Sequence, residues 1–249
     1  MSIPVVEGET SLEAWRVGAA LLLKSGCSLN NLITTIASPC LIDPMWLTAL
    51  SPHEFSSKGD NIRDVVNTIF PIKIAGQSTC RGDLYSEYLR CHDRAHKWRR
   101  GRHTWGTYFE RLTRFPSARN KREVSESIKR ENVNQLERVI EKLRSWRRRS
   151  TTGLVFHLSS PVFDTPRTRG GPCWHYGELL WNHDDSIDLV AVYRNHDFYN
   201  KVLGNFIGLG LLLKYICNES DKVAGKLICH SVHAYCDSSA RQALLNMVA

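Results

Sequence analysis

The chain has 249 residues, of which 42% are hydrophobic and 23% charged, and its formal net charge is +8. This composition is typical of a globular protein and excludes the collagenous and low-complexity classes. The longest apolar-rich run, residues 202–213, is well short of the roughly 20 residues that a membrane span needs. The N-terminus has no basic flank, apolar stretch or small-residue cleavage site, so we expect no secretory signal and a cytoplasmic protein.

The chain contains eight cysteines, and no two of them stand at C-x-x-C spacing. In a long chain without a secretory signal, cysteines are usually reduced and buried rather than paired in a disulfide framework. We therefore predict mostly buried free thiols and no zinc site.

Positive charge is concentrated between Arg90 and Arg149, where 19 Lys and Arg stand against 7 Asp and Glu. Clustered guanidinium groups can bind nucleic acid because they displace the counterions of the phosphates. The same segment could instead form a solvated helical face, or a pocket for one phosphorylated small molecule.

In the N-terminal half, apolar spacing predicts a helix over residues 12–24 and one or two β-branched strands over residues 29–41. A second helix is predicted over residues 61–70, ended by Pro71. A long amphipathic helix is predicted from about Arg122 to Trp146, and the arginines near its C-terminal end suit the helix dipole.

In the C-terminal half, three strands are predicted over residues 153–158, 174–181 and 187–193, separated by turns rich in Pro, Gly and Asp. A strongly apolar helix over residues 197–217 and a strand over residues 223–233 follow. Helices and strands are mixed without strict alternation, which predicts a single α+β domain over residues 1–249.

Four short motifs in the last third of the chain carry the candidate chemistry. They are Pro172-Cys173, Arg194-Asn195-His196-Asp197, Gly204-Asn205 and His233-x-Tyr235. Their order and spacing resemble the catalytic half of the thymidylate synthase and pyrimidine nucleotide hydroxymethylase family, which acts on dUMP, dCMP or CMP. The resemblance covers residues 133–235 well and the first 130 residues only weakly. It implies a mixed sheet packed with helices and a homodimer.

The resemblance implies one-carbon transfer from 5,10-methylenetetrahydrofolate to C5 of a pyrimidine nucleotide. Cys173 would be the nucleophile that adds to C6, because C5 needs the electrons of such an adduct to attack the one-carbon donor. Arg194 would lower the pKa of the Cys173 thiol through its positive charge. Asp64 lies where the family has a glutamate that relays protons to O4.

The resemblance also assigns the groups that would bind the nucleotide and the folate. Arg194 would bind the phosphate, with Asn195 in place of a hydroxyl donor. Asn205 would face the base, and an amide favours uracil because it both donates and accepts. His233 and Tyr235 would bind the sugar hydroxyl, and Asp197 would contact folate or cap the following helix. The alternatives for these residues are structural: a buried thiol, a surface ion pair and aromatic core packing.

Two departures from the family pattern shape the prediction. Thr151 and Thr152 stand where the family has the paired arginines that reach the partner subunit's phosphate, so Arg148 and Arg149 are the expected substitutes. Only fourteen residues follow Tyr235, fewer than in the synthases. A missing lid would admit water to the one-carbon intermediate, which favours a 5-hydroxymethyl product. Ser231 also resembles the hydroxymethylases.

Two other functions remain open at this point. One is a thymidylate synthase proper, which would release dihydrofolate after reductive methylation of dUMP. The other is a non-catalytic nucleotide-binding or RNA-binding homologue, suggested by the altered folate region and the basic segment.

Overall fold

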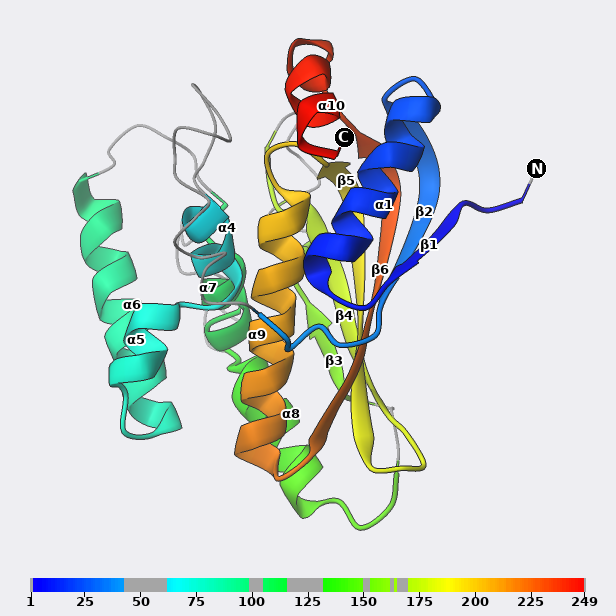
Figure 1. Cartoon of the computed structure of the whole chain (residues 1–249). Coiled ribbons are helices and arrows are strands. Elements are labelled where there is room, and N and C mark those ends of the chain that lie inside the picture. The colour runs from blue at the N-terminus through cyan, green and yellow to red at the C-terminus, as the bar shows by residue number, and fades with distance from the viewer. Residues whose placement is uncertain are drawn as a thin grey trace.

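A computed structural model describes residues 2–42, 62–98, 105–115, 132–149, 153–161, 164 and 170–248. One mixed six-stranded sheet forms the centre, with the strands in the order β1-β2-β6-β5-β4-β3 (Figure 1). The strands are β1 (Val5–Gly8), β2 (Ser28–Ile36), β3 (Val155–His157), β4 (Trp174–Trp181), β5 (Ser186–Asp197) and β6 (Val223–Tyr235). The architecture is α+β, as the sequence predicts.

The directions of the strands decide which residues meet at one edge of the sheet. β5 pairs parallel with β6, and β1 pairs parallel with β2, whereas the other three pairings are antiparallel. β5 and β6 therefore end at the same edge, and the antiparallel neighbours β4 and β2 begin there. We call this end of the sheet, at the top of Figure 1, the β5–β6 end.

The described helices lie on one face of the sheet (Figure 1). They are α1 (Ser11–Lys24), α4 (Ile62–Ile69), α5 (Ile72–Gln77), α6 (Arg81–Trp98), α7 (Tyr108–Thr113), α8 (Gln135–Ser145), α9 (Val202–Ser220) and α10 (Arg241–Val248), with a 3-10 turn at Ser238–Ala240. α9 is apolar on almost every side because it contacts the sheet on one side and α4 on the other. None of the described helices is long and apolar enough to cross a membrane.

The close packing of α4 on α9 depends on two glycines. A methyl group at Gly204 would lie 2.8 Å from Cβ of Val65, and one at Gly208 would lie 3.0 Å from Cβ of Ile69. Larger residues at these positions would push the two helices apart. The packing sets the first turn of α4 beside the first turn of α9.

Helix α8 begins later than the sequence predicts. Val133 forms a β-bridge with Phe115, and the side chain of Asn134 caps the helix by accepting a 2.9 Å hydrogen bond from the N–H of Glu137. Residues 132–134 are therefore not helical, which corrects the predicted start at Arg122. Residues 116–131 lie outside the described part of the chain.

The boundaries of β5 and α9 also differ from the prediction. β5 extends to Asp197, and α9 begins only at Val202. The Asp197 carboxylate accepts hydrogen bonds from the N–H groups of Tyr199 and Asn200, at 3.0 and 3.1 Å, so it stabilises a turn before the helix rather than capping the helix itself. Strand β1 and helices α5, α6, α7 and α10 have no counterpart among the predicted elements.

The cysteines are free, as predicted, but they are less buried than predicted. Cys217, Cys229 and Cys236 are buried, whereas Cys80 and Cys91 are exposed. The other three are partly buried. Exposure at α6 accounts for the difference, because both exposed thiols lie on or beside this outer helix.

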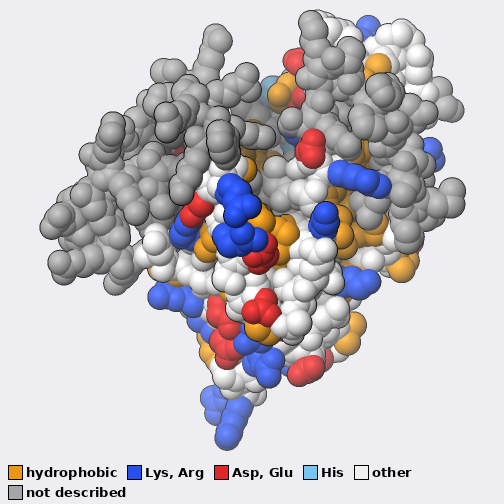
Figure 2. Space-filling model, turned by 90° about the vertical axis from the view of Figure 1, so that its left-hand side faces the viewer, with side chains coloured by type: hydrophobic (Ala, Val, Ile, Leu, Met, Phe, Trp, Pro, Cys, Tyr) orange, Lys and Arg blue, Asp and Glu red, His pale blue; other side chains and the backbone are white. Residues whose placement is uncertain are grey.

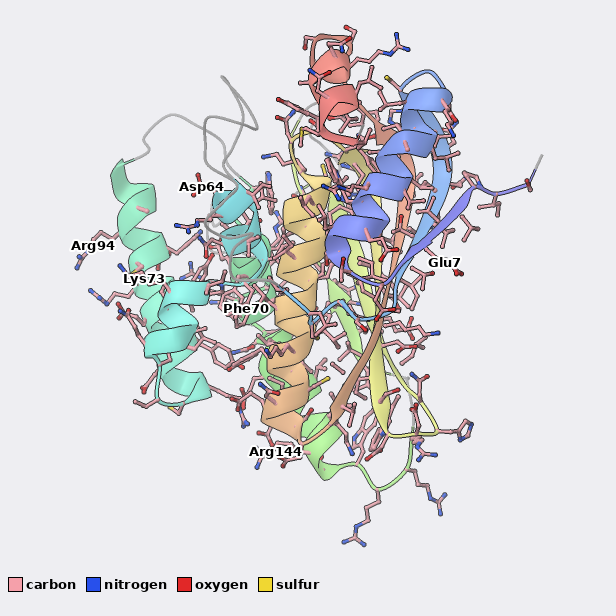
Figure 3. All side chains as sticks on the ribbon, in the orientation of Figure 1. Glu7, Asp64, Phe70, Lys73, Arg94 and Arg144 are labelled. Carbon is pink, nitrogen blue, oxygen red and sulfur yellow. The ribbon has the colours of Figure 1, made fainter. Side chains whose placement is uncertain are left out.

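The face of the sheet opposite the helices carries alternating side chains that no described helix covers (Figure 1). Val5 is 57% exposed and Val232 is 40% exposed on this face. Glu7 points away from the helices, as Figure 3 shows. We call this surface the open face. Its half-buried members include Ile33, Thr35, Val190, Val192 and Ile228.

Candidate active site

The sequence motifs converge at the β5–β6 end of the sheet. The N–H of Arg194 donates a 2.9 Å hydrogen bond to the carbonyl of Cys173, across the β4–β5 hairpin. On the next strand, His233 pairs with Asn195 and Tyr235 pairs with Asp197. Residues from three adjacent strands therefore surround one position at the end of the sheet.

The backbone at Cys173 is held by a tyrosine that the sequence reasoning missed. The Tyr108 hydroxyl accepts hydrogen bonds from the N–H groups of Cys173 and Trp174, at 3.1 and 3.2 Å. Its ring packs against those of Trp174 and Tyr193, with centroids 5.6 and 6.3 Å apart. Tyr108 belongs to the short helix α7, 65 residues before Cys173, so no local pattern could have linked the two residues.

The Cys173 thiol is partly buried, and this burial decides its acidity. Desolvation raises the pKa of Cys173, while the charge of Arg194 and a hydrogen bond from it act in the opposite direction. Burial outweighs the guanidinium, and nearby Asp197 adds to the rise. Arg194 therefore lowers the pKa of Cys173, as the sequence predicts, but the effect of burial is larger and the net pKa is raised.

Arg194 also organises the segment that leads into Cys173. Its Nε donates to the carbonyl of Pro172 at 3.2 Å, and its Nη2 donates to the carbonyl of Gly170 at 2.7 Å. A guanidinium has five N–H groups, so these two bonds leave others for an anion. The partial exposure of Arg194 makes them accessible to solvent.

His233 and Tyr235 stack on each other at the end of β6, with ring centroids 5.5 Å apart and an 11° interplanar angle. His233 Nδ1 lies 3.2 Å from Asn195 Oδ1, and its Nε2 lies 3.1 Å from Ser28 Oγ. The amide oxygen can only accept, so Nδ1 donates to it, and both ring nitrogens are engaged in hydrogen bonds. A sugar hydroxyl would have to displace Ser28 to reach His233.

At this position the Tyr235 hydroxyl is more available to a sugar than the His233 ring, whose two nitrogens are already hydrogen-bonded. Burial raises its pKa to about 12, and Asp197, Asp237 and Cys173 contribute through their negative charges. A phenol with so high a pKa keeps its proton at neutral pH and can donate it in a hydrogen bond.

Asn205 is buried, with 4% of its surface exposed, in the first turns of α9. Its amide nitrogen Nδ2 lies 3.1 Å from Nε2 of His196, which in turn lies 2.7 Å through Nδ1 from Ser231 Oγ. The sequence predicted roles for Asn205 and Ser231, and it marked His196 as a neighbour of Asn205, but it did not predict the hydrogen bonds that join the three.

Asp64 lies toward the β5–β6 end of the molecule, but in the outer helical layer and not on the sheet. It stands in the first turn of α4 and is exposed, next to Val65, which contacts Gly204 (Figure 3). Within the described residues, no hydrogen bond or ion pair joins Asp64 to Cys173 or Arg194. Its proposed proton relay would need a different side-chain orientation or bridging water.

Arg148 and Arg149 lie at the opposite end of the sheet from Cys173. Arg149 Nη1 is 3.2 Å from Nδ1 of His183, in the turn between β4 and β5. Strand β4 separates this turn from Cys173, a span of roughly 25 Å at about 3.3 Å per residue. In a single chain, Arg149 cannot bind a phosphate held at Arg194.

Several arginines of the basic segment form ion pairs within the chain. Arg114 bonds to Asp93 and Glu110, and Arg111 bonds to Asp164. Basic, acidic and hydrophobic side chains are interspersed over the described elements of the helical side (Figure 2). The described part of this segment is therefore not a uniformly positive surface.

One group of potential metal ligands occurs among the described residues, formed by His92, Asp93 and Glu110. Arg114 donates to both carboxylates, at 2.6 and 2.9 Å. Its guanidinium supplies the positive charge that a cation would otherwise supply, so this group is an ion-pair network joining α6 to α7.

No protein-family model matches the sequence. A protein of Methanococcoides burtonii described as "Putative thymidylate synthase" is 31% identical over 103 residues. This chain is similar to that protein. The matched part is 41% of this chain and 46% of the relative, so the chain spans less than half of the relative's length.

Proposed function

We propose that the protein transfers a one-carbon unit from 5,10-methylenetetrahydrofolate to C5 of a pyrimidine nucleotide. The observation that carries the proposal is that the pairing of β4, β5 and β6 gathers four residues at the β5–β6 end of the sheet: Cys173, Arg194, Asp197 and Tyr235. The similarity to a protein named as a thymidylate synthase supports the same chemistry.

Cys173 supplies the nucleophile. Its sulfur forms a bond to C6 of the pyrimidine, and the electron pair of the C5–C6 double bond moves onto C5 and O4. C5 can then attack an electrophilic carbon, and loss of the C5 proton and of the thiolate restores the ring. Because burial raises the pKa of Cys173, Arg194 must stay beside the sulfur when the nucleotide binds for the thiolate to form.

Asp197 fits a role in folate binding. Bound methylenetetrahydrofolate would supply the carbon to be transferred. Asp197 Oδ1 accepts two backbone hydrogen bonds, while Oδ2 accepts one, from Asn200 Nδ2 at 2.8 Å. A carboxylate oxygen has about two acceptor sites, so Oδ2 keeps capacity for an N–H donor of a pterin ring.

The finer assignment is 5-hydroxymethylation of the nucleotide rather than reductive methylation. It rests on Ser231, which resembles the hydroxymethylases, and it makes water the final acceptor of the one-carbon intermediate. Asn205 favours a uracil base because its amide both donates and accepts.

A homodimer would complete the phosphate site. Arg148 and Arg149 are exposed at the far end of the sheet, and two copies packed through their open faces could bring the arginines of one chain to Arg194 of the other. The β-branched and partly exposed residues of the open face suit such a contact.

A non-catalytic nucleotide-binding protein is the second candidate. The raised pKa of Cys173 favours it, because a thiol that stays protonated is a weak nucleophile. The interspersed charges of the helical side argue against an extended nucleic-acid surface.

Incubation of the protein with methylenetetrahydrofolate and UMP, dUMP, CMP or dCMP, followed by mass spectrometry of the nucleotides, tests the proposal. A hydroxymethyl product supports the assignment, and a methyl product together with dihydrofolate indicates a thymidylate synthase. Binding of a nucleotide without product, and without exchange of its C5 hydrogen, would leave the second candidate.

A further inference from the structure

We propose that His196 is a positioning residue that fixes the orientation of the Asn205 amide and so selects which pyrimidine edge the site accepts. The inference deepens the proposed function and rests on it. It concerns a buried chain of hydrogen bonds that runs from α9 through β5 to β6.

Three side chains form this chain, and each comes from a different element. His196 Nε2 lies 3.1 Å from Asn205 Nδ2 on α9, and His196 Nδ1 lies 2.7 Å from Ser231 Oγ on β6. The exposed fractions are 1% for His196, 4% for Asn205 and 0% for Ser231. Water therefore has little access to replace these hydrogen bonds.

The protonation of His196 follows from its surroundings. Burial lowers the pKa of His196 to about 3, so the ring is neutral at physiological pH and carries one N–H. An amide NH2 group can only donate, so Nε2 must accept from Asn205. The proton therefore sits on Nδ1 and is donated to Ser231 Oγ.

The direction of the chain continues beyond Ser231. With its oxygen accepting from His196, the Ser231 hydroxyl is free to donate, and a hydrogen bond from it acts to lower the pKa of the Cys229 thiol. Every donor thus points from α9 toward β6. Reversing the Asn205 amide would require each member to change its role.

Aromatic neighbours hold the imidazole ring in place. Tyr193 stacks on it, with centroids 4.1 Å apart and a 7° interplanar angle. Phe198 and Phe206 meet it edge-on, with centroids at 6.2 and 5.8 Å. The same Tyr193 ring packs on Tyr108, which bonds to the N–H of Cys173, so the chain is contiguous with the nucleophile.

The consequence for the base lies at Asn205. One of its two N–H groups is engaged by His196, which leaves the carbonyl oxygen and the second N–H at fixed positions. In this orientation the amide can accept from N3–H and donate to O4 of uracil, whereas cytosine presents the reverse pattern. Turning the amide would face its oxygen toward the lone pair of His196 Nε2. We expect the site to prefer uracil over cytosine nucleotides by about 5- to 150-fold.

Nitrogen NMR of the full-length protein labelled at histidine tests the first half of the inference. The signals of His196 are assigned by their loss in His196→Gln. The expected spectrum shows a protonated Nδ1, an unprotonated Nε2 and no titration between about pH 5 and 8. A proton on Nε2, or a cationic ring at about pH 7, would overturn the inference without reference to any activity.

Dissociation constants for UMP, dUMP, CMP and dCMP test the second half. Ser231→Ala removes the acceptor of the Nδ1 proton, so the ring can move its proton to Nε2 and the amide can turn. The preference for uracil should fall by about 5- to 150-fold. Ser231→Thr keeps the hydroxyl and should restore it. His230→Gln, on the opposite face of β6, is the matched control and should leave the ratio unchanged.

The outcomes separate this inference from the proposed function. If the wild type binds no pyrimidine nucleotide, the proposed function fails and base selection fails with it. If the wild type binds nucleotides but Ser231→Ala keeps the same base ratio, only the role of His196 is overturned. A reduced ratio in Ser231→Ala with a restored ratio in Ser231→Thr supports it.

Discussion

The N–H of Arg194 donates a 2.9 Å hydrogen bond to the carbonyl oxygen of Cys173. The two residues are separated by a complete hairpin, formed by β4, a short Asp-rich turn and most of β5. The spacing between the two motifs in the sequence therefore equals the length of this hairpin. Because the backbones are bonded to each other, the thiol and the guanidinium hold a fixed relative position.

Replacement of the proposed nucleophile should abolish chemistry and spare binding. Cys173→Ala should eliminate product and exchange of the pyrimidine C5 hydrogen, because no sulfur remains to add to C6, while the nucleotide still binds through Arg194. Exchange is measured by loss of tritium from C5. Cys40→Ala is the matched control, since Cys40 is also partly buried with a pKa raised by burial. Normal exchange in Cys173→Ala would end the covalent mechanism.

The reactivity of Cys173 should depend on pH in a defined direction. A thiol with a raised pKa is mostly protonated near neutrality, so its alkylation by iodoacetamide should keep accelerating above about pH 9. Arg194→Ala removes the group that counteracts burial and should move the midpoint to still higher pH. Mass mapping of the labelled peptide at each pH gives the rate. A midpoint below the usual thiol range would contradict the dominance of burial.

The arginines at the far end of the sheet should matter for the phosphate alone. One lost charge-assisted hydrogen bond corresponds to about 1.5–3 kcal/mol, so Arg149→Ala should weaken binding of a nucleotide by about 10- to 150-fold and leave the matching nucleoside unaffected. Arg148→Ala should behave similarly. Calorimetric titration and sedimentation of the same samples check both parts. Equal losses for the two ligands, or a monomer with unaltered nucleotide affinity, would exclude a phosphate site shared between two chains.

The packing of α4 on α9 should tolerate no side chain at Gly204. A methyl group there would lie 2.8 Å from Cβ of Val65 and 3.3 Å from the carbonyl oxygen of Ile62, so Gly204→Ala should lower the free energy of unfolding by about 1–3 kcal/mol. Gly82→Ala, on the exposed surface of α6, should be neutral or stabilising by up to about 1 kcal/mol. Urea denaturation of both variants measures the difference, and equal stabilities would refute the close contact.

The buried His196 should make the protein sensitive to acid. Its pKa is about 3 in the folded chain and 6.5 in the reference state, so the unfolded state binds the proton more tightly. The contribution of neutral His196 to the free energy of unfolding is therefore fully present above about pH 6.5. It is lost as the pH falls, by up to about 3 kcal/mol near pH 4. His196→Gln should flatten this part of the curve, whereas His230→Gln should retain it. An unchanged slope in His196→Gln would contradict a neutral buried imidazole.

Local patterns in the sequence were sufficient for β4, but they ended β5 at Tyr193, whereas the strand continues to Asp197 and carries Arg194. The boundaries of β4 agree with the prediction, because buried and half-buried residues alternate from Tyr176 to Leu180 and only the two ends of the strand break the alternation. The same patterns failed at α8, which begins only after the cap at Asn134 and the bridge from Val133 to Phe115, although the helical periodicity extends further toward the N-terminus. They also missed α6, which is held by ion pairs from Arg81 to Glu137 and Glu219 on other helices.

The sequence alone determined the α+β class and the order and spacing of the motifs, because alternation, turn residues and hairpin length are properties of short stretches of chain. Only the tertiary structure decided the acidity of Cys173, the hydrogen-bond partner of Asn205 and the distance of Arg149 from the β5–β6 end of the sheet. Desolvation depends on atoms contributed by distant segments, and a hydrogen bond between α9 and β5 exists only once the helix has packed on the sheet. These properties belong to the folded arrangement and to no single stretch of residues.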